Sequence, residues 1–126
     1  MKYKLYTTYL SKLKTAPENA MKLIIMRFPP ISFKMYKNTV HCPELSPDAD
    51  LLMKYKKDND FNAFSENYLK CIYNNEKASL AIDNIIDCLD NYNDIVLVCC
   101  EKDSSICHRT ILAKELEKIG YKYNEL

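Results

Sequence analysis

The chain has one glycine in 126 residues, Gly120, and this scarcity excludes whole classes of site. A Walker A loop and a G-x-G-x-x-G fingerprint each need several glycines, so neither device binds ATP or NAD here. No apolar run reaches the length of a membrane span, and the opening residues do not resemble a signal peptide. We therefore expect a cytoplasmic protein with no membrane partner.

Arginine is nearly as rare as glycine. Of the eighteen basic residues only Arg27 and Arg109 are arginines, and the others are lysines. In a chain that uses lysine by default, arginine favours a position that needs planar, bidentate hydrogen bonding, such as an anion site. The alternative is that both are ordinary salt-bridge partners.

The six cysteines could indicate a secreted disulfide scaffold, but their spacing is irregular. We expect reduced thiols instead. No two of them form the Cys-x-x-Cys spacing typical of zinc ribbons and of thioredoxin-like redox sites. The sequence therefore predicts no bound metal and no cofactor.

The charge is unevenly distributed along the chain. Residues 1–43 hold eight lysines and arginines against one acidic residue, whereas the rest holds ten basic and sixteen acidic residues. Such asymmetry indicates either a basic face for an anionic partner or two halves that attract each other within the fold.

Three apolar runs predict strands over residues 3–8, 22–27 and 94–99. The second run is apolar on both faces, as in a buried parallel strand, and Phe28-Pro29-Pro30 ends it because proline cannot donate to a ladder. Residues 31–47 show no periodicity, and we expect a long loop there, of the kind that carries function.

Helical spacing dominates between the second and third strands. Ser46 before Pro47 predicts the start of a first helix, and Asp60 predicts the cap of a second. A third helix is expected over about residues 78–89. The last helix is expected to end with Gly120 as its C′ residue.

Strands separated by helices indicate an α/β fold: a single three-layer domain over residues 1–126, with a small, mainly parallel sheet flanked by helices. Ligands of such sheets bind beyond the carboxyl ends of the strands. The polar side chains expected at that edge are Thr7, Thr8, Tyr9, Arg27, Cys99, Cys100 and Glu101.

The segment 94–120 is the most informative part of the chain. A strand that ends in two cysteines crosses a polar loop and enters a helix that opens with Cys107, His108 and Arg109. A helix N-terminus offers free N–H groups and a positive dipole end, so we expect the pKa of Cys107 to be depressed. Glu101 on the loop is a candidate general base.

Five blocks of sequence follow one another along the chain: YTTYLSKLK, LIIMRFPP, LSPDADLLMKYK, FSENYL and VLVCCEKDSSICHRTILAKEL. Together they resemble the domain-of-unknown-function family 488 over nearly the whole chain. The most diagnostic block contains Cys100, Glu101, Lys102, Cys107, His108 and Arg109. The resemblance implies an α/β fold and a polar site around that block, and it implies no particular activity.

Four interpretations of this constellation stay open. In the first, Arg27, Arg109 and the helix N–H groups bind a phosphate or carboxylate, with Thr7, Thr8 and Tyr9 as further donors. We then expect both arginines to face one mouth, and the Glu101 carboxylate to occupy it when no ligand is bound. In the second, Cys100 and Cys107 cycle through a disulfide.

The third interpretation is a zinc site built from Cys100, Cys107 and His108 with His41 or Cys42, which the spacing disfavours. The fourth is that the cysteines are small buried hydrophobes and Arg109 is structural. A phosphatase-like loop is disfavoured because the position that needs its arginine, six residues after Cys100, is Ile106.

We therefore expect a protein that binds or acts on an anionic small molecule, either nucleotide-like or phosphorylated. If it is an enzyme, Cys107, His108 and Glu101 are the candidate catalytic residues. The alternatives are a non-catalytic nucleic-acid-binding module that uses the basic N-terminal part, and a thiol redox protein that uses Cys100 and Cys107. The sequence does not decide between an enzyme and a binding module.

Overall fold

Five parallel strands form one sheet in the computed structural model, which describes residues 3–126. In chain order they are β1 (Leu5–Tyr9), β2 (Met21–Ile24), β3 (Thr39–His41), β4 (Ile95–Cys99) and β5 (Tyr123–Glu125). Their spatial order is β3-β2-β4-β1-β5, so the three predicted strands are adjacent, and every pairing is parallel. The prediction of an α/β fold with a parallel sheet is confirmed.

The central position of strand β4 explains its apolar composition. All five of its residues are buried, because each face of the sheet is covered. Alternate residues therefore enter two cores: Leu97 packs among the α-helices, and Val96 and Val98 pack with Leu13 and Phe33 on the other face. A strand buried on both faces needs a continuous apolar run rather than an alternating one.

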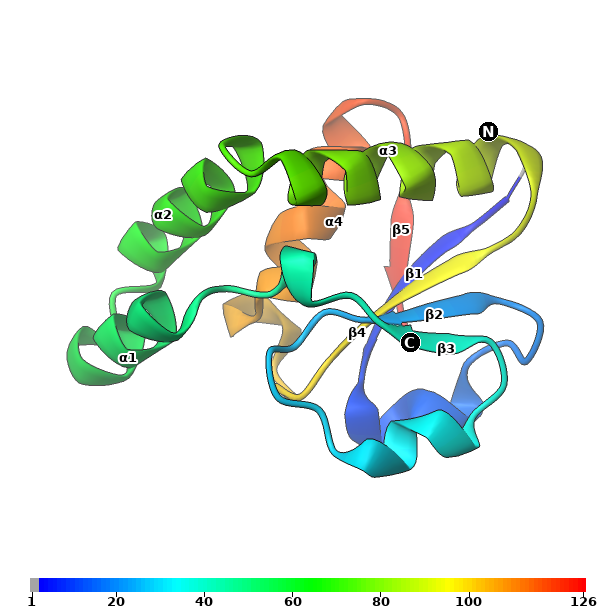
Figure 1. Cartoon of the computed structure of the whole chain (residues 1–126), viewed down its shortest axis with the longest axis horizontal. Coiled ribbons are helices and arrows are strands. Elements are labelled where there is room, and N and C mark those ends of the chain that lie inside the picture. The colour runs from blue at the N-terminus through cyan, green and yellow to red at the C-terminus, as the bar shows by residue number, and fades with distance from the viewer. Residues whose placement is uncertain (1–2) are drawn as a thin grey trace.

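Four α-helices cover the first face, and two of the short 3₁₀ helices, those that carry Leu13 and Phe33, cover the second (Figure 1). The α-helices are α1 (Ala49–Asp58), α2 (Phe61–Tyr73), α3 (Glu76–Asn91) and α4 (His108–Lys118). The 3₁₀ helices are η1 (Leu10–Thr15), η2 (Ile31–Met35), η3 (Pro43–Leu45) and η4 (Ser104–Ile106). Among the described residues no helix has both the length and the apolar character to cross a membrane.

Two of the predicted helix boundaries are confirmed and one is wrong. The Asp60 side chain accepts a hydrogen bond from the Ala63 N–H at the start of α2, and Gly120 follows α4 with φ of +105°. The cap of α1 is Asp48, which accepts from the Leu51 N–H. Ser46, the predicted cap, ends η3 instead, where its hydroxyl donates to the Pro43 carbonyl.

The expected long loop over residues 31–47 is more ordered than its sequence indicates. It contains η2, the edge strand β3 and η3. Two short 3₁₀ turns and a three-residue strand are each too brief to produce a hydrophobic period, which is why they were not predicted.

Candidate active site around Cys107

Two cysteines meet at the edge of the sheet where the strands end. Cys99 is the last residue of β4 and pairs in register with Tyr9, the last residue of β1. After η4 the chain returns to this edge, and Cys107 occupies the N-cap position of α4. Both side chains are buried, with Cys107 only 3% exposed.

The environment of Cys107 favours its thiolate. The pKa of Cys107 falls to about 4, chiefly because the Cys99 thiol donates a hydrogen bond to it. Burial opposes the change, and His108 and the Arg109 backbone N–H support it. Burial, and then the contact with Cys107, raise the pKa of Cys99, so the proton of the pair resides on Cys99. The anion at the N-terminus of α4 is thus the protein's own sulfur.

His108 is held from two sides. Its Nε2 lies 2.6 Å from the Ile25 carbonyl oxygen, and because a carbonyl only accepts, we assign the ring proton to Nε2. The same nitrogen lies 3.2 Å from Cys99 Sγ. The ring also packs edge-on against Tyr68, with 5.4 Å between the centroids. His108 is therefore held in one orientation, in which it contacts both Cys99 and Cys107.

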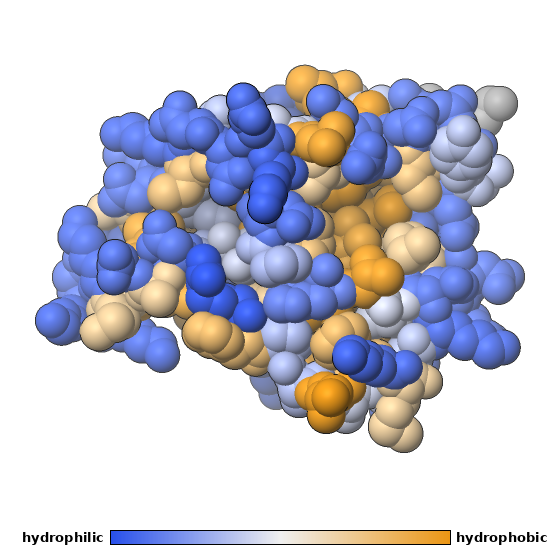
Figure 2. Space-filling model, in the orientation of Figure 1, coloured by the Kyte–Doolittle hydropathy of each residue, from blue (hydrophilic) through white to orange (hydrophobic). Residues whose placement is uncertain are grey.

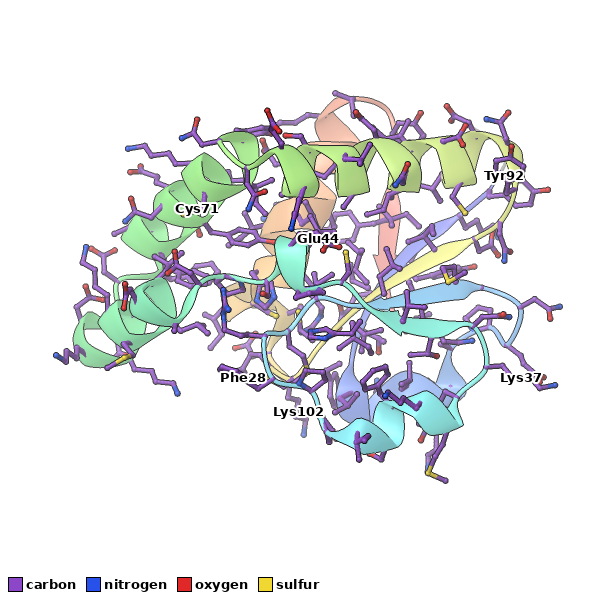
Figure 3. All side chains as sticks on the ribbon, viewed as in Figure 1. Phe28, Lys37, Glu44, Cys71, Tyr92 and Lys102 are labelled. Carbon is purple, nitrogen blue, oxygen red and sulfur yellow. The ribbon has the colours of Figure 1, made fainter. Side chains whose placement is uncertain are left out.

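The two thiols line a cavity of about 260 Å³, and the exposed Cys100 lines it as well. His108 lines it from α4, and Tyr55, Lys56 and Phe64 line it from the neighbouring pair of helices, α1 and α2. Lys56 and Glu101 are exposed at its rim. The Glu101 carboxylate accepts a hydrogen bond from the Asp103 N–H, which orders the loop after β4; Figure 3 labels Lys102 on that loop.

Arg109 points away from this cavity into a closed polar cluster. It is fully buried, and its Nε and Nη2 donate to the two carboxylate oxygens of Glu125 over 3.1 and 2.8 Å. Its Nη1 donates to the Glu101 carbonyl. The expectation that the Glu101 carboxylate would occupy this position is wrong: Glu125 supplies the carboxylate, and Glu101 contributes only its backbone.

Arg27, the other rare arginine, has a backbone partner as well. It is half-buried, and its Nε donates to the Pro47 carbonyl over 2.9 Å. Among the described residues that line the Cys107 cavity, neither arginine is found. The structure therefore does not bring Arg27 and Arg109 together in a shared mouth.

The predicted donors after β1 surround Arg109 rather than an open site. The Thr7 hydroxyl donates to Glu125 over 2.6 Å, and the Tyr9 ring lies under the Arg109 guanidinium, 5.9 Å from its carbon. The Thr8 hydroxyl is buried and has no hydrogen-bond partner in the described chain.

Sequence reasoning placed Cys99 at this edge of the sheet but gave it no role in the site, and chose Cys100 as the partner of Cys107. Cys99, Cys107 and His108 each place one sulfur or nitrogen atom within 4.8 Å of the others, whereas Cys100 is exposed and lies outside this group. Successive residues of a strand face opposite sides, so the residue that faces the helix layer with Leu97 had to be Cys99. The missed signal was this alternation.

Cys99, Cys107 and His108 are also the ligand types that zinc prefers. The His108 nitrogen nearest Cys99 already donates to the Ile25 carbonyl, so a metal would have to be held through Nδ1, which lies 3.8 Å from Cys99 Sγ. The zinc set considered from sequence, which included Cys100 with His41 or Cys42, is not assembled in the described residues.

Comparison with known families gives a match over most of the chain. A model of the family DUF488-N3a, described as the active DUF488-N3 subclade, matches residues 5–120. The match covers most of the chain, so the protein belongs to this DUF488 family. Neither the curated proteins nor the solved structures gave a match. Strand β5, with Glu125, lies beyond the matched residues.

Proposed function

We propose that the protein is an enzyme in which the Cys107 thiolate attacks an electrophilic centre of a negatively charged small molecule. One observation supports this most strongly: the thiol with the lowered pKa starts a helix and also lines a cavity. A thiolate at neutral pH is the nucleophilic form of cysteine, and a cavity gives it a place for substrate.

The walls of the cavity favour a substrate with an apolar body and an anionic group. Tyr55 and Phe64 supply aromatic surface, with 5.1 Å between their ring centroids. Lys56 is the cation at the rim. Because both arginines have partners elsewhere, we assign recognition of the anionic group to Lys56 rather than to Arg27 and Arg109.

The proposed reaction has two steps. Cys107 Sγ forms a bond to the electrophilic carbon or phosphorus, and the bond to the leaving group breaks with its electron pair. The leaving group takes a proton, for which the Cys99 thiol is the nearest donor to Cys107. Water then attacks the adduct, Glu101 accepts the proton of that water, and Cys107 leaves as thiolate. Glu101 releases this proton to solvent and Cys99 takes one up, which restores the resting pair.

Alkylation with iodoacetamide at about pH 6, followed by peptide mapping, tests the nucleophile. We expect Cys107 to be labelled before Cys71 and Cys100. Both of these residues are exposed, but partial desolvation of each sulfur raises its pKa and lowers its thiolate fraction. Labelling of Cys71 and Cys100 ahead of Cys107 would overturn the proposal.

The charge preference is tested with a matched pair of alkylating agents, anionic iodoacetate and neutral iodoacetamide. We expect Lys56→Gln to lower the iodoacetate-to-iodoacetamide rate ratio at Cys107 about threefold, the effect of one partly screened charge. Lys57→Gln, an exposed neighbour outside the cavity lining, is the control and should leave the ratio unchanged.

Turnover is tested with p-nitrophenyl acetate. An initial burst of p-nitrophenolate, with an acetyl group found on Cys107 by mass spectrometry, is the expected result. The Cys107→Ser variant should show no burst. A burst that is equal in the wild type and this variant would assign the reaction to another group.

A further inference from the structure

The Cys99 thiol has a use that the proposed reaction leaves open. Its sulfur and that of Cys107 belong to a group of atoms within 4.8 Å of one another. Both residues also line the same cavity, although Cys99 has no solvent-exposed surface and Cys107 is 3% exposed. A small oxidant that reaches the nucleophile therefore finds a second thiol beside it.

We propose that Cys99 is the resolving thiol of Cys107: a hydroperoxide that enters the cavity oxidises Cys107, and Cys99 then closes a disulfide with it. This inference rests on the proposed function, because it requires a nucleophilic Cys107. It adds a reversible oxidative switch that blocks the nucleophile and protects it from further oxidation.

The chemistry balances in two steps. Cys107 thiolate attacks one oxygen of the hydroperoxide, an S–O bond forms, the O–O bond breaks, and the alcohol leaves after taking a proton. Cys99 then attacks the sulfenic sulfur, the S–S bond forms, the S–O bond breaks, and water leaves. Two thiols are oxidised and one hydroperoxide is reduced to alcohol and water; the Cys99 proton and one proton from solvent complete the balance.

Geometry selects Cys99 over its neighbour. A disulfide requires sulfurs about 2.0 Å apart, and the Cys99 and Cys107 sulfurs already lie within 4.8 Å of each other. Cys99 faces the helix layer from the end of β4, and Cys107 caps α4 directly against it. Cys100, the next residue along, is exposed and also lines the cavity, but it lies outside the group of converging atoms.

Peptide mapping after treatment with hydrogen peroxide tests the switch. Trypsin cuts after Lys102, which separates Cys107 from a peptide that carries Cys88, Cys99 and Cys100. We expect peroxide to link these two peptides and to abolish alkylation of Cys107, and dithiothreitol to reverse both effects. The double variant Cys88→Ser/Cys100→Ser retains Cys99 alone in that peptide and should still form the link.

Loss of the link in the double variant would overturn the inference, whatever the folding of any Cys99 variant. In Cys99→Ala we expect Cys107 to gain two or more oxygen atoms that dithiothreitol does not remove, because no thiol resolves the sulfenic acid. If iodoacetamide labels Cys107 rapidly but peroxide forms no link, the switch is wrong and the nucleophile stands. If Cys107 is inert to both reagents, the proposed function fails as well.

Discussion

Two buried cysteines on the helix-covered face of the sheet have almost the same exposure and opposite chemistry. Cys42 is 7% exposed and Cys107 is 3% exposed. The pKa of Cys107 falls to about 4, whereas burial and the Glu44 carboxylate raise the pKa of Cys42 far above the usual thiol range. Burial alone therefore does not decide whether a thiol in this fold is reactive.

The difference lies in what each sulfur contacts. Cys107 accepts hydrogen bonds from the Cys99 thiol and from the backbone at the start of α4. Cys42 instead donates to the Glu44 carboxylate. Donors that surround a sulfur stabilise its anion, and an acceptor that carries negative charge stabilises its proton. In Figure 3, Glu44 lies on η3 beneath α3, while Lys102 marks the loop after β4, closer to Cys107 in the chain.

The cavities that the two cysteines line also differ in polarity. Cys42 lines an apolar groove of about 330 Å³ between α3 and strands β2 and β3, where Figure 2 shows hydrophobic side chains gathered. Cys107 lines a cavity whose rim carries both Lys56 and Glu101. The groove around Cys42 is mainly apolar, and the one contact that favours the thiolate, from the Leu45 backbone, is outweighed by burial and by the Glu44 carboxylate, so we assign Cys42 to packing.

The largest effect is expected from Glu125, whose carboxylate neutralises the buried Arg109 beside the Cys107 loop. Glu125→Gln should lower the free energy of unfolding by about 3 kcal/mol, because it leaves a buried guanidinium without its counter-charge. Urea unfolding measures this. Glu117→Gln, an exposed acid nearby, should change stability by less than about 0.5 kcal/mol. Equal effects of the two substitutions would show that the ion pair does not support the Cys107 region.

The second effect is a direct rate comparison of the two thiols. At about pH 6 we expect Cys107 to be alkylated at least about tenfold faster than Cys42, because its larger thiolate fraction outweighs its lower intrinsic nucleophilicity. The Cys107 rate should stay level down to about pH 5 and fall as the pH approaches the pKa of about 4. If the Cys107 rate instead rises steadily up to about pH 9, Cys107 has the pKa of an ordinary thiol, and the proposed difference from Cys42 is wrong.

Much of the fold that makes this contrast was predictable, because its signals are local. The continuous apolar run of β4, the cap at Asp60 and the αL position of Gly120 each depend on one segment of chain. The position of Cys107 at a helix start followed from the same kind of signal.

The partners in the site were not predictable, because they depend on tertiary register. Strand β5 (Tyr123–Glu125) has no apolar alternation, and only its pairing with β1 places Glu125 against Arg109. The choice of Cys99 over Cys100 required the last residue of β4 to be known, and an error of one residue exchanges the two faces of a strand. The sequence therefore placed Cys107 correctly at the start of a helix, while the charge that balances Arg109 was assigned to the wrong acid.

The third effect is the pH dependence of stability. The pKa of Cys107 is lower folded than unfolded, so its contribution is complete above the unfolded value near pH 9 and is lost as the pH falls toward about 4. Over the single unit from about pH 6 to pH 7 the wild type should gain stability relative to Cys107→Ser by up to about 1.4 kcal/mol, the limit for one proton.

Cys42 provides the control for that measurement. Because its pKa is raised, it stays protonated in both the folded and the unfolded protein below about pH 8. The Cys42→Ala variant should therefore lose a constant amount of stability across the range, with no slope relative to the wild type. A slope in Cys42→Ala, or its absence in Cys107→Ser, contradicts the assigned protonation states.

The smallest expected effect is an increase in the reactivity of Cys42, which would reduce the difference in reactivity between Cys42 and Cys107. Glu44→Gln removes the negative charge beside Cys42 and keeps an amide oxygen that can accept from the thiol. Burial is the larger cause of the raised pKa and is unchanged, so alkylation of Cys42 at about pH 8 should rise only about threefold. Glu66→Gln, an exposed acid on α2, should leave the rate unchanged, and the Cys107 rate should stay constant in both variants. If Glu44→Gln accelerates labelling of both thiols equally, the substitution loosens the fold as a whole, and the charge of Glu44 is not what keeps Cys42 inert.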